Sequence, residues 1–400
     1  MACVDVAHTE NIPFIVTATA ATSNDSNAPY INGNIFQGHD PTTLYESFIT
    51  RFYNMFLEPV QWGWYLRRSV SDLMKQKARV GIRSVGLSLD LFWGDSLKLV
   101  NNVFGIEPAR PMGPLVELVG PIISRTYDPL TDNFRQFLDT HHHVAYIAFG
   151  QHGTPTADDV KLILTALLEN IEQNTIDGFL WATTTKNFPQ SVTTSSNKTY
   201  IISDLFNKAD GTSDTMLVNW APQQAVLQHP SVSFFLSHGG VTSLFEGMFS
   251  GKRMIIFPFL CDQHANAVAV EHYQLGGRFD YKTPQDQVNE LMGKVALDVD
   301  GSIQENVNKH KALVQIHSRS GAKRGADFVE EVAFMNKNGK LPHRYEVARE
   351  MSFMKARNLD LYFAFISTLA IPTVLAYKII RFIAPKGTQA ILHKEKAKKM

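Results

Sequence analysis

Three short apolar runs lie close together in the sequence, and each ends in polar residues and tight turns. They cover residues 216–219, 232–236 and 254–259, and they lead into Trp220, the SHGG segment at 237–240, and the pair Asp262-Gln263. Short apolar runs bounded by turns are typical of buried parallel strands. Because ligands bind beyond the carboxyl ends of such strands, this pattern predicts a ligand pocket lined by the polar residues.

A helix is predicted between the second and third runs. The apolar side chains that recur there at helical spacing are Val241, Leu244, Phe245, Met248 and Phe249. Gly251 then ends the helix. The pair Gly239-Gly240 falls at a strand-to-helix turn, where bare backbone and the helix dipole favour an anion such as a diphosphate. Glu246 is placed to accept hydrogen bonds from a ribose diol, and Trp220 offers a flat face for a base.

The rest of the chain alternates strand and helix patterns, which indicates an α/β fold. Strands are predicted at 10–20, 144–149 and 178–183, strands with turns at 97–122, and short helices at 130–138 and 156–170. Thr156 and Asp159 have the spacing of a capping box. After Asn266 the pattern is helical, with a turn predicted at Gly276-Gly277.

Residues 41–77 form a long, aromatic-rich stretch with helical periodicity. Within it, Phe48, Phe52, Met55 and Phe56 are spaced as one stripe, and we expect this stripe to pack in the core. The alternative is that the helix lines an apolar cleft for an acceptor, and packing is the preferred interpretation.

Composition and charge exclude several kinds of site. Thirty-eight basic residues balance 38 acidic ones, so nothing in the net charge favours nucleic acid as a partner. Cys3 and Cys261 are too few for a disulfide framework or a zinc site. The histidine run at 141–143 lacks metal-ligand spacing, and we interpret it as a solvated loop. No metal site is predicted.

The C-terminal region has the pattern of a membrane anchor. Residues 361–377 carry no formal charge, and counting through residue 384 gives a helix of roughly 30 Å, long enough to cross a bilayer. Basic residues follow the span, which predicts a cytosolic tail at 385–400. The tail ends in KAKKM, which resembles a retrieval signal of the endoplasmic reticulum. The N-terminus lacks the pattern of a signal peptide. Two glycosylation sequons, at 24–26 and 197–199, are compatible with a lumenal body.

The motifs between Trp220 and Gln263 resemble the donor-site signature of the UDP-glycosyltransferase family. The match comprises WAPQ, the LxHP segment at 227–230, HGG, a Ser and Glu three apart, and the terminal DQ, over 44 positions. The resemblance implies a GT-B fold with two Rossmann-like domains, here with the N-terminal one incomplete, plus a C-terminal transmembrane helix. The expected divisions are 1–125 for part of the acceptor domain with a linker, 126–335 for the donor domain, 336–360 for a connector and 361–384 for the membrane helix.

The resemblance also assigns roles to individual residues. Trp220 would stack on uracil, Gln223 would help to position the nucleoside, and Glu246 would hold the ribose hydroxyls. The residues expected at the diphosphate are His238, Gly239, Gly240 and Ser243. Asp262 and Gln263 would read the sugar hydroxyls. Each residue alone could instead pack or cap a strand end, but the set at matching spacing favours binding. UDP-sugar is then a co-substrate, and no cofactor is expected.

The front of the chain departs from the family. The resemblance places a catalytic His and its orienting Asp upstream of Met1, so no catalytic residue is assigned, and we expect poor activity from these 400 residues. His8 is not a credible substitute. The expected function is inverting transfer of a hexosyl group from UDP-sugar to a hydroxyl of a lipophilic acceptor, at the endoplasmic reticulum membrane. The alternative is a non-catalytic UDP-sugar-binding subunit that needs a partner chain; an epimerase is disfavoured. Whether the chain forms a homo-oligomer stays an open question at this point.

Overall fold

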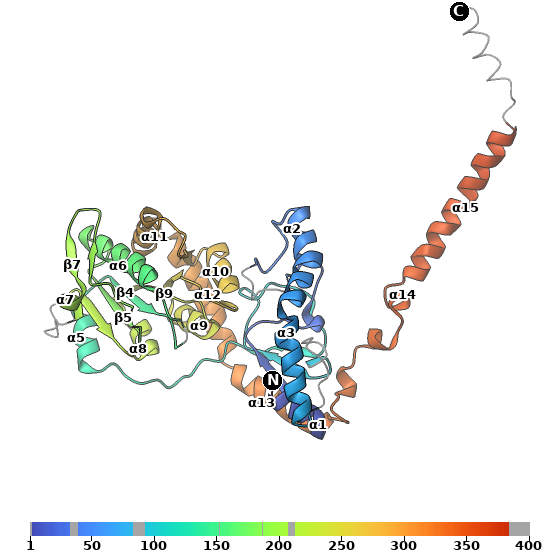
Figure 1. Ribbon diagram of the computed structural model, residues 1–400, viewed down its shortest axis with the longest axis horizontal. Coiled ribbons are helices and arrows are strands. Elements are labelled where there is room, and N and C mark those ends of the chain that lie inside the picture. The colour runs from blue at the N-terminus through green and yellow to red at the C-terminus, as the bar shows by residue number, and fades with distance from the viewer. Residues whose placement is uncertain are drawn as a thin grey trace, which may run out of the picture. The chain divides into compact units, whose positions relative to one another are not determined.

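The structure is a computed structural model that describes residues 2–32, 39–82, 93–151, 153–185, 187–206 and 213–383. The chain divides into two compact units, 1–343 and 344–400. The first unit contains two parallel sheets, and the second contains a long helix (Figure 1). The predicted tail at 385–400 lies outside the described residues, and the predicted division of the first unit near residue 125 stays a prediction.

The larger sheet is parallel and has six strands in the order β11-β10-β9-β4-β5-β8. Its strands are β4 (Val144–Ala148), β5 (Gly178–Ala182), β8 (Thr215–Val218), β9 (Val232–Ser237), β10 (Arg253–Ile256) and β11 (Gly276–Arg278). The central strands are fully buried because helices cover both faces of the sheet, which is why their sequences are continuous apolar runs (Figure 1). All three runs from 216 to 259 are strands, as predicted.

Helices alternate with these strands. They are α5 (Asp132–Thr140), α6 (Ala157–Glu172), α7 (Ile202–Phe206), α8 (Gln223–Gln228), α9 (Val241–Ser250), α10 (Gln263–His272), α11 (Gln285–Leu297), α12 (Ser302–Ser318) and α13 (Gly321–Met335). The capping box at Thr156 and Asp159 is confirmed, because each side chain accepts the other's backbone N–H. Gly251 ends α9 in the left-handed conformation, with φ of 74°. The polar insertion after β5 forms a hairpin of β6 (Ser191–Thr193) and β7 (Thr199–Ile201).

The smaller sheet has three parallel strands, β1 (Ile15–Ala18), β2 (Leu97–Val100) and β3 (Val116–Leu118). The predicted strand at 10–20 is therefore shorter than expected, because helix α1 (Ala2–Glu10) precedes it. A short 3-10 helix, η1 (Asn24–Ser26), follows β1. Leu97, Leu99 and Leu115 pack with Val332 and Leu341 in a small core of their own. The end of α13 thus returns to the smaller sheet.

The prediction that Phe48, Phe52, Met55 and Phe56 form a core stripe is wrong. These residues lie on one continuous helical stretch made of α2 (Phe48–Phe52), a π-helical turn η3 (Tyr53–Leu57) and α3 (Glu58–Arg79). All four side chains are exposed, and Phe48 is 72% exposed. Periodicity correctly indicated the helix, but it does not state what the apolar stripe contacts. The alternative, an acceptor-lining helix, stays a prediction.

Two further expectations are corrected. Gly276 and Gly277 belong to strand β11 and do not form a turn, because Ile255 and its neighbours in β10 supply pairing partners. In the histidine run, His141 is buried against Phe137 and its Nδ1 lies 2.7 Å from the Phe137 carbonyl, so only the next two histidines match a solvated loop.

The second unit consists mainly of α15 (Leu359–Ile383). Three short elements precede it, η4 (Pro342–Arg344), η5 (Val347–Glu350) and α14 (Phe353–Ala356). Within α15, residues 359–380 are long and apolar enough to cross a membrane, and Pro372 lies inside the helix. Its apolar side chains are exposed, and a helix of this length that is apolar on all sides is typical of a membrane span.

Candidate functional site

The strand order of the larger sheet locates the candidate site. From β4 the chain builds outward through β5 and β8, then returns with β9 to the other side of β4. In such sheets ligands bind outside the carboxyl ends of the strands where the order reverses. Here that point lies between β4, which leads into Gly150, and β9, which leads into His238.

Four polar side chains meet at this point. The Tyr146 hydroxyl donates to Gln223 Oε1 over 3.4 Å, and Gln223 Nε2 donates to Ser243 Oγ over 3.1 Å. Gln223 Nε2 also donates to a carboxylate oxygen of Glu246 in a short hydrogen bond. These residues come from β4, α8 and α9, so the fold assembles the group from separate segments. Of these, Gln223, Ser243 and Glu246 were predicted as site residues, and the structure brings them together.

Burial controls the ionisation of this group. It raises the pKa of the Glu246 carboxyl, and the hydrogen bond from Gln223 partly opposes the change. Burial also raises the pKa of Tyr146, with a smaller contribution from the Glu246 charge. Tyr146 therefore stays a neutral donor, while Glu246 is an acceptor whose charge is lost at higher pH than that of an exposed glutamate.

A cavity of about 640 Å³ opens beside these side chains. Tyr146, Gln223 and Glu246 line it, together with residues of the segments 124–128 and 182–184. Trp220 also lines it and is 64% exposed, so one face of its indole is free for a flat ligand. The volume lies within the range of small-molecule and cofactor sites.

The geometry of the turn after His238 explains why both of the next two residues are glycine. Gly239 has φ of 83°, and a Cβ there would lie 2.6 Å from Ile256 Cγ2. A Cβ on Gly240 would lie 2.5 Å from His238 Nε2. Gly240 is also the N-cap of α9 and brings no side chain to cap it. The first-turn N–H groups of α9 can therefore face an anion.

His238 is enclosed by this turn. Its Nδ1 is buried, and no described residue offers it a hydrogen bond. Burial lowers the pKa of His238, and a hydrogen bond with the Ala148 backbone opposes this change. The imidazole is thus neutral at pH 7, so in the free protein the favourable potential for an anion comes from the helix terminus and not from a histidine charge. A buried ring nitrogen without a partner is the kind of polar atom that a bound ligand satisfies.

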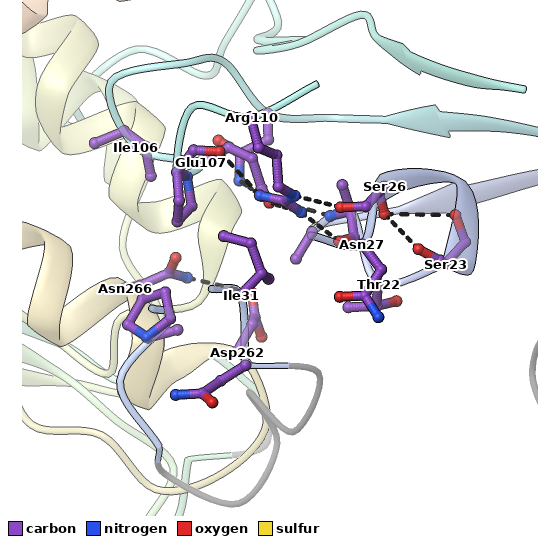
Figure 2. Close-up of a pocket in the computed structure, with 17 residues that line it drawn as sticks. Thr22, Ser23, Ser26, Asn27, Ile31, Ile106, Glu107, Arg110, Asp262 and Asn266 are labelled. Carbon is purple, nitrogen blue, oxygen red and sulfur yellow. Dashed lines mark hydrogen bonds and ion pairs between the residues drawn. The ribbon is translucent and has the colours of Figure 1, made fainter. Parts of the chain in front are cut away.

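Asp262 lies at a second, smaller cavity of about 210 Å³, shown in Figure 2. Its carboxylate accepts from Asn266 Nδ2 over 3.2 Å, and the same nitrogen donates to the Gly239 carbonyl over 2.7 Å. Burial raises the pKa of Asp262, and hydrogen bonds that include those from Thr19 and the Val241 N–H oppose the change. Asp262 therefore links the glycine turn before α9 to the segment after β1.

Gln263 has a different environment from its neighbour. Its Oε1 accepts the backbone N–H groups of Phe259 and Leu260, over 2.8 and 3.0 Å, and the side chain is buried. This amide shapes the loop between β10 and α10. Its predicted contact with sugar hydroxyls stays a prediction, as do the ligand contacts of the other eight site residues.

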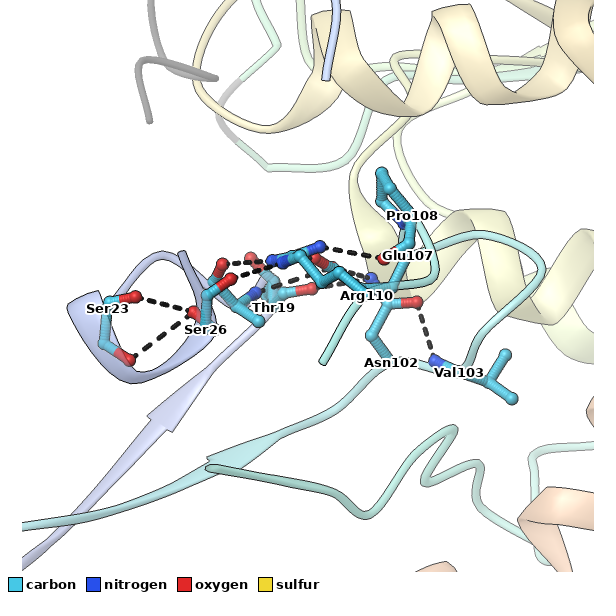
Figure 3. Close-up of polar contacts among 9 residues, drawn as sticks. Thr19, Ser23, Ser26, Asn102, Val103, Glu107, Pro108 and Arg110 are labelled. Carbon is cyan, nitrogen blue, oxygen red and sulfur yellow. Dashed lines mark hydrogen bonds and ion pairs between the residues drawn. The ribbon is translucent and has the colours of Figure 1, made fainter. Parts of the chain in front are cut away.

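The far wall of the smaller cavity is a buried polar network that the sequence did not reveal (Figure 3). Arg110 Nη2 pairs with Glu107 Oε1 over 2.8 Å and donates to the Ala21 carbonyl over 2.6 Å, and Arg110 Nε donates to the Ser26 carbonyl. Asn102 Nδ2 donates to Glu107 Oε2 over 3.2 Å. Burial raises the pKa of Glu107, and Arg110 opposes this. The network ties the loop after β1 to the loop after β2.

Sequence reasoning missed several residues near these cavities. Tyr146, Asn266 and the Glu107–Arg110 pair have contacts at the site but were not predicted. The i,i+3 spacing of Glu107 and Arg110, each of which is followed directly by a proline, was the available signal for the pair. Tyr146 had no such signal in the sequence, because it lies in an apolar run. Its hydroxyl reaches Gln223 only when β4 lies beside β9 and α8 follows β8.

A parallel sheet with a cavity at its switch point and a glycine turn before a helix is typical of nucleotide-binding α/β proteins. The family described as UDP-glucoronosyl and UDP-glucosyl transferase matches residues 47–394, which is most of the chain. The chain belongs to this family.

Curated relatives agree with the family. A UDP-glycosyltransferase of Talaromyces amestolkiae is 30% identical over 297 residues, which cover 70% of this chain and 55% of that protein. UDP-glycosyltransferase 1 of Phaeomoniella chlamydospora is 31% identical over 287 residues, which cover 68% of this chain and 56% of that protein. The chain thus spans about half the length of these relatives.

A solved structure supports the fold. The crystal structure of the glycotransferase of kitacinnamycin superimposes with a TM-score of 0.51 at 18% identity, covering 83% of this chain and 73% of that one. At this identity the likeness concerns the fold alone, and the fold is of GT-B type.

Proposed function

We propose that this chain binds a UDP-sugar at the switch point of its larger sheet and carries the donor half of an inverting glycosyltransferase. The observation that supports this most is the assembly of Gln223, Ser243 and Glu246 beside a cavity of about 640 Å³, next to a glycine turn at the start of α9. Uracil would stack on Trp220, and the ribose hydroxyls would donate to Glu246.

The diphosphate would lie at the N-terminus of α9. There the first-turn N–H groups of α9 can donate to its oxygens, beside the buried ring of His238. These donors stabilise the charge that develops on UDP as the bond between the anomeric carbon and the diphosphate oxygen breaks. The attacking group would be an acceptor hydroxyl, which forms the new bond from the opposite face and releases its proton to a base.

No residue of the described chain is assigned the role of this base. The resemblance assigns it to a His on a strand-loop of the acceptor domain, and we expect little transfer by the chain alone. The acceptor class that we propose is a lipophilic alcohol, with the body in the lumen of the endoplasmic reticulum and α15 in its membrane. The support for this is the exposed, apolar α15 and the chemistry of substrates that partition into bilayers.

Calorimetry with UDP tests the donor site. We expect wild-type protein to bind UDP, and Gly240→Ala to weaken binding at least about tenfold, because the new Cβ would displace the His238 ring and block close approach of the anion. Gly325→Ala in α13 is the matched control, since nothing lies within 4 Å of a Cβ there. Wild-type protein that gives no binding signal would overturn the proposal.

A second measurement separates enzyme from binding subunit. UDP release from UDP-glucose or UDP-glucuronate is measured with a panel of lipophilic alcohols, with the full chain in detergent. UDP binding without release is the expected result for the isolated chain. Rapid release that depends on an added alcohol would show that a base is present after all.

A further inference from the structure

The sequence contains two glycosylation sequons, Asn24-Asp25-Ser26 and Asn197-Lys198-Thr199, and the donor site uses neither. An N-linked glycan is large and hydrophilic, so a folded protein can carry it only where the asparagine and its neighbours face solvent. The structure places Asn197, Lys198 and Thr199 at the surface but buries the side chains of Asp25 and Ser26, and this difference makes a specific prediction.

The second sequon lies at the tip of the β6–β7 hairpin. Asn197 N–H donates to the Thr194 carbonyl over 3.0 Å, and Thr194 N–H donates to the Lys198 carbonyl over 3.0 Å. Asn197 closes this three-residue loop in the left-handed conformation, with φ of 63°, which asparagine adopts more readily than most residues. Asn197, Lys198 and Thr199 are all exposed.

The hairpin is attached to the protein by its other residues. Thr194, Ser196 and Tyr200 each donate a hydroxyl hydrogen bond to the Glu172 carboxylate at the end of α6, over 3.0, 2.8 and 2.9 Å. Ser195 N–H donates to Glu169 over 2.6 Å. These contacts hold the loop against α6 and do not involve the Asn197 side chain. A glycan on Asn197 would therefore extend into solvent without breaking any of them.

In the first sequon, the two residues that follow Asn24 are packed. Asp25 forms a buried ion pair with Lys98 at 2.7 Å, and both side chains are at most 5% exposed. Ser26 is 1% exposed, and its hydroxyl donates to the Ser23 carbonyl over 2.8 Å. Its carbonyl accepts from Arg110, within the network of Figure 3. A glycan attached in this segment would conflict with the buried contacts of the two residues that follow Asn24.

We propose that Asn197 is an N-glycosylation site of this protein and that Asn24 is not. The donor is a lipid-diphosphate-linked oligosaccharide of the secretory pathway. The Asn197 amide nitrogen bonds to the anomeric carbon, the bond from that carbon to the phosphate oxygen breaks, the lipid diphosphate leaves with the electron pair, and the amide proton is released. The site rests on the lumenal orientation in the proposed function.

The test is expression of the full chain in eukaryotic cells, followed by electrophoresis before and after treatment with peptide N-glycosidase. Wild type should carry one glycan. Asn197→Gln and Thr199→Val should lose it, whereas Thr199→Ser, which keeps the sequon, and Asn24→Gln should retain it. Thr199→Val keeps a β-branched residue in β7 but loses the contact of its hydroxyl with Thr193 Oγ1 at 3.0 Å, whereas Asn197→Gln leaves that contact in place. Loss of the glycan in both variants therefore reports on the sequon and not on the hairpin.

A control sequon separates the two ways in which the idea can fail. Lys340→Thr completes a new sequon that begins at Asn338, which is exposed and has φ of 54° in a tight turn like that of Asn197. It should add a second glycan. If the control is modified but Asn197 is not, or if Asn24 carries the glycan, the inference is wrong while the lumenal orientation stands. If neither Asn197 nor the control is modified, the lumenal orientation itself is wrong, and the inference fails with it.

Discussion

Glu246 shows how one buried carboxyl can set the conditions for ligand binding. Burial in the group with Gln223 and Ser243 raises its pKa, and the Gln223 amide limits the rise. A ribose diol donates more strongly to an ionised carboxylate than to a neutral carboxyl, so the deprotonated form binds it more tightly. Protonation also weakens the hydrogen bond from Gln223, because the neutral carboxyl is a poorer acceptor.

We therefore predict that UDP affinity is constant above the raised pKa of Glu246 and falls as pH decreases through it, at higher pH than the usual value of 4.5 would give. Glu246→Gln should lower affinity by about 10- to 100-fold at neutral pH, as expected for a lost hydrogen bond to a charged group. Its remaining pH dependence should be smaller, coming from the other buried groups, His238 and Asp262.

Calorimetric titration with UDP from pH 5 to 8 measures this dependence. Glu305→Gln on the surface of α12 is the matched control and should follow wild type, because this carboxylate is exposed and pairs only with Lys309 on its own helix. An identical pH profile for wild type and Glu246→Gln would contradict the assignment of Glu246.

At this scale the sequence predicted the residues whose positions follow from local pattern. Gln223, Ser243 and Glu246 follow strand ends or share a helix face, and their meeting was foreseeable. Tyr146 and Asn266 were not, since their polar atoms reach the site only through the adjacency of β4 and β9 and the approach of α10 to Gly239. A one-dimensional pattern does not contain that adjacency.

Among the elements, strand β11 was missed for a physical reason. It has three residues, two of them glycine, so no side-chain alternation marks it, and it exists because β10 offers an edge to pair with. Gly276 adopts φ of 149°, and a Cβ there would lie 1.8 Å from the Met254 carbonyl oxygen. The glycine that hides the strand from sequence analysis is thus the residue that permits the pairing.

The prediction for this element compares two identical substitutions. Gly276→Ala should lower the free energy of unfolding by about 2–4 kcal/mol, through backbone strain and the clash with β10. Gly325→Ala, inside α13 with open space around its Cα, should raise it by about 0.5–1 kcal/mol. Chemical denaturation followed by tryptophan fluorescence measures both changes. Equal effects of the two substitutions would contradict the close approach of β11 to β10.

The stretch from α2 to α3 shows that periodicity predicts a helix but not what covers its apolar stripe. The helix exists where the pattern placed it, but among residues 48–79 only Glu58 and Lys77 are buried, with Lys77 paired to Asp5 at 2.8 Å. A helical stripe reports that apolar side chains share a face. It does not report whether core, membrane or another chain covers that face.

For the whole molecule, the division into units 1–343 and 344–400 predicts separable behaviour. We expect the full chain to stay with membranes after alkaline carbonate extraction, because α15 is long and apolar enough to cross a bilayer. A chain ending at His343 should be released. Leu369→Arg, which places a charge in the middle of α15, should weaken retention of the full chain, since a central arginine costs about 2.5–3.5 kcal/mol in a membrane helix.

Leu66→Arg on the exposed part of α3 is the control for that experiment and should leave retention of the full chain unchanged. If the 1–343 chain stays with membranes and Leu66→Arg releases it, then α3, and not α15, holds the protein to the membrane.

The alternation of strands and helices indicated an α/β fold, and the GT-B type was implied by the family resemblance of the donor-site motifs. The loops between the elements of the smaller sheet did not follow, because their shape depends on the buried contacts of Arg110 and Asn102. Buried polar residues of this kind have no periodic signature, and the backbone carbonyls of Thr19 and Ala21 that they contact are more than 80 residues away in the sequence.

That network has a consequence for the energetics of ligand entry. Arg110 and Asn102 fix the loop after β1 to the loop after β2 before any ligand arrives, so the entropy of ordering that wall is lost during folding. A molecule that enters the smaller cavity does not have to immobilise these side chains, each of which would otherwise cost about 0.5–1.5 kcal/mol on binding. The wall is preorganised, and its rigidity favours a ligand that fits its fixed shape over one that requires the loops to move.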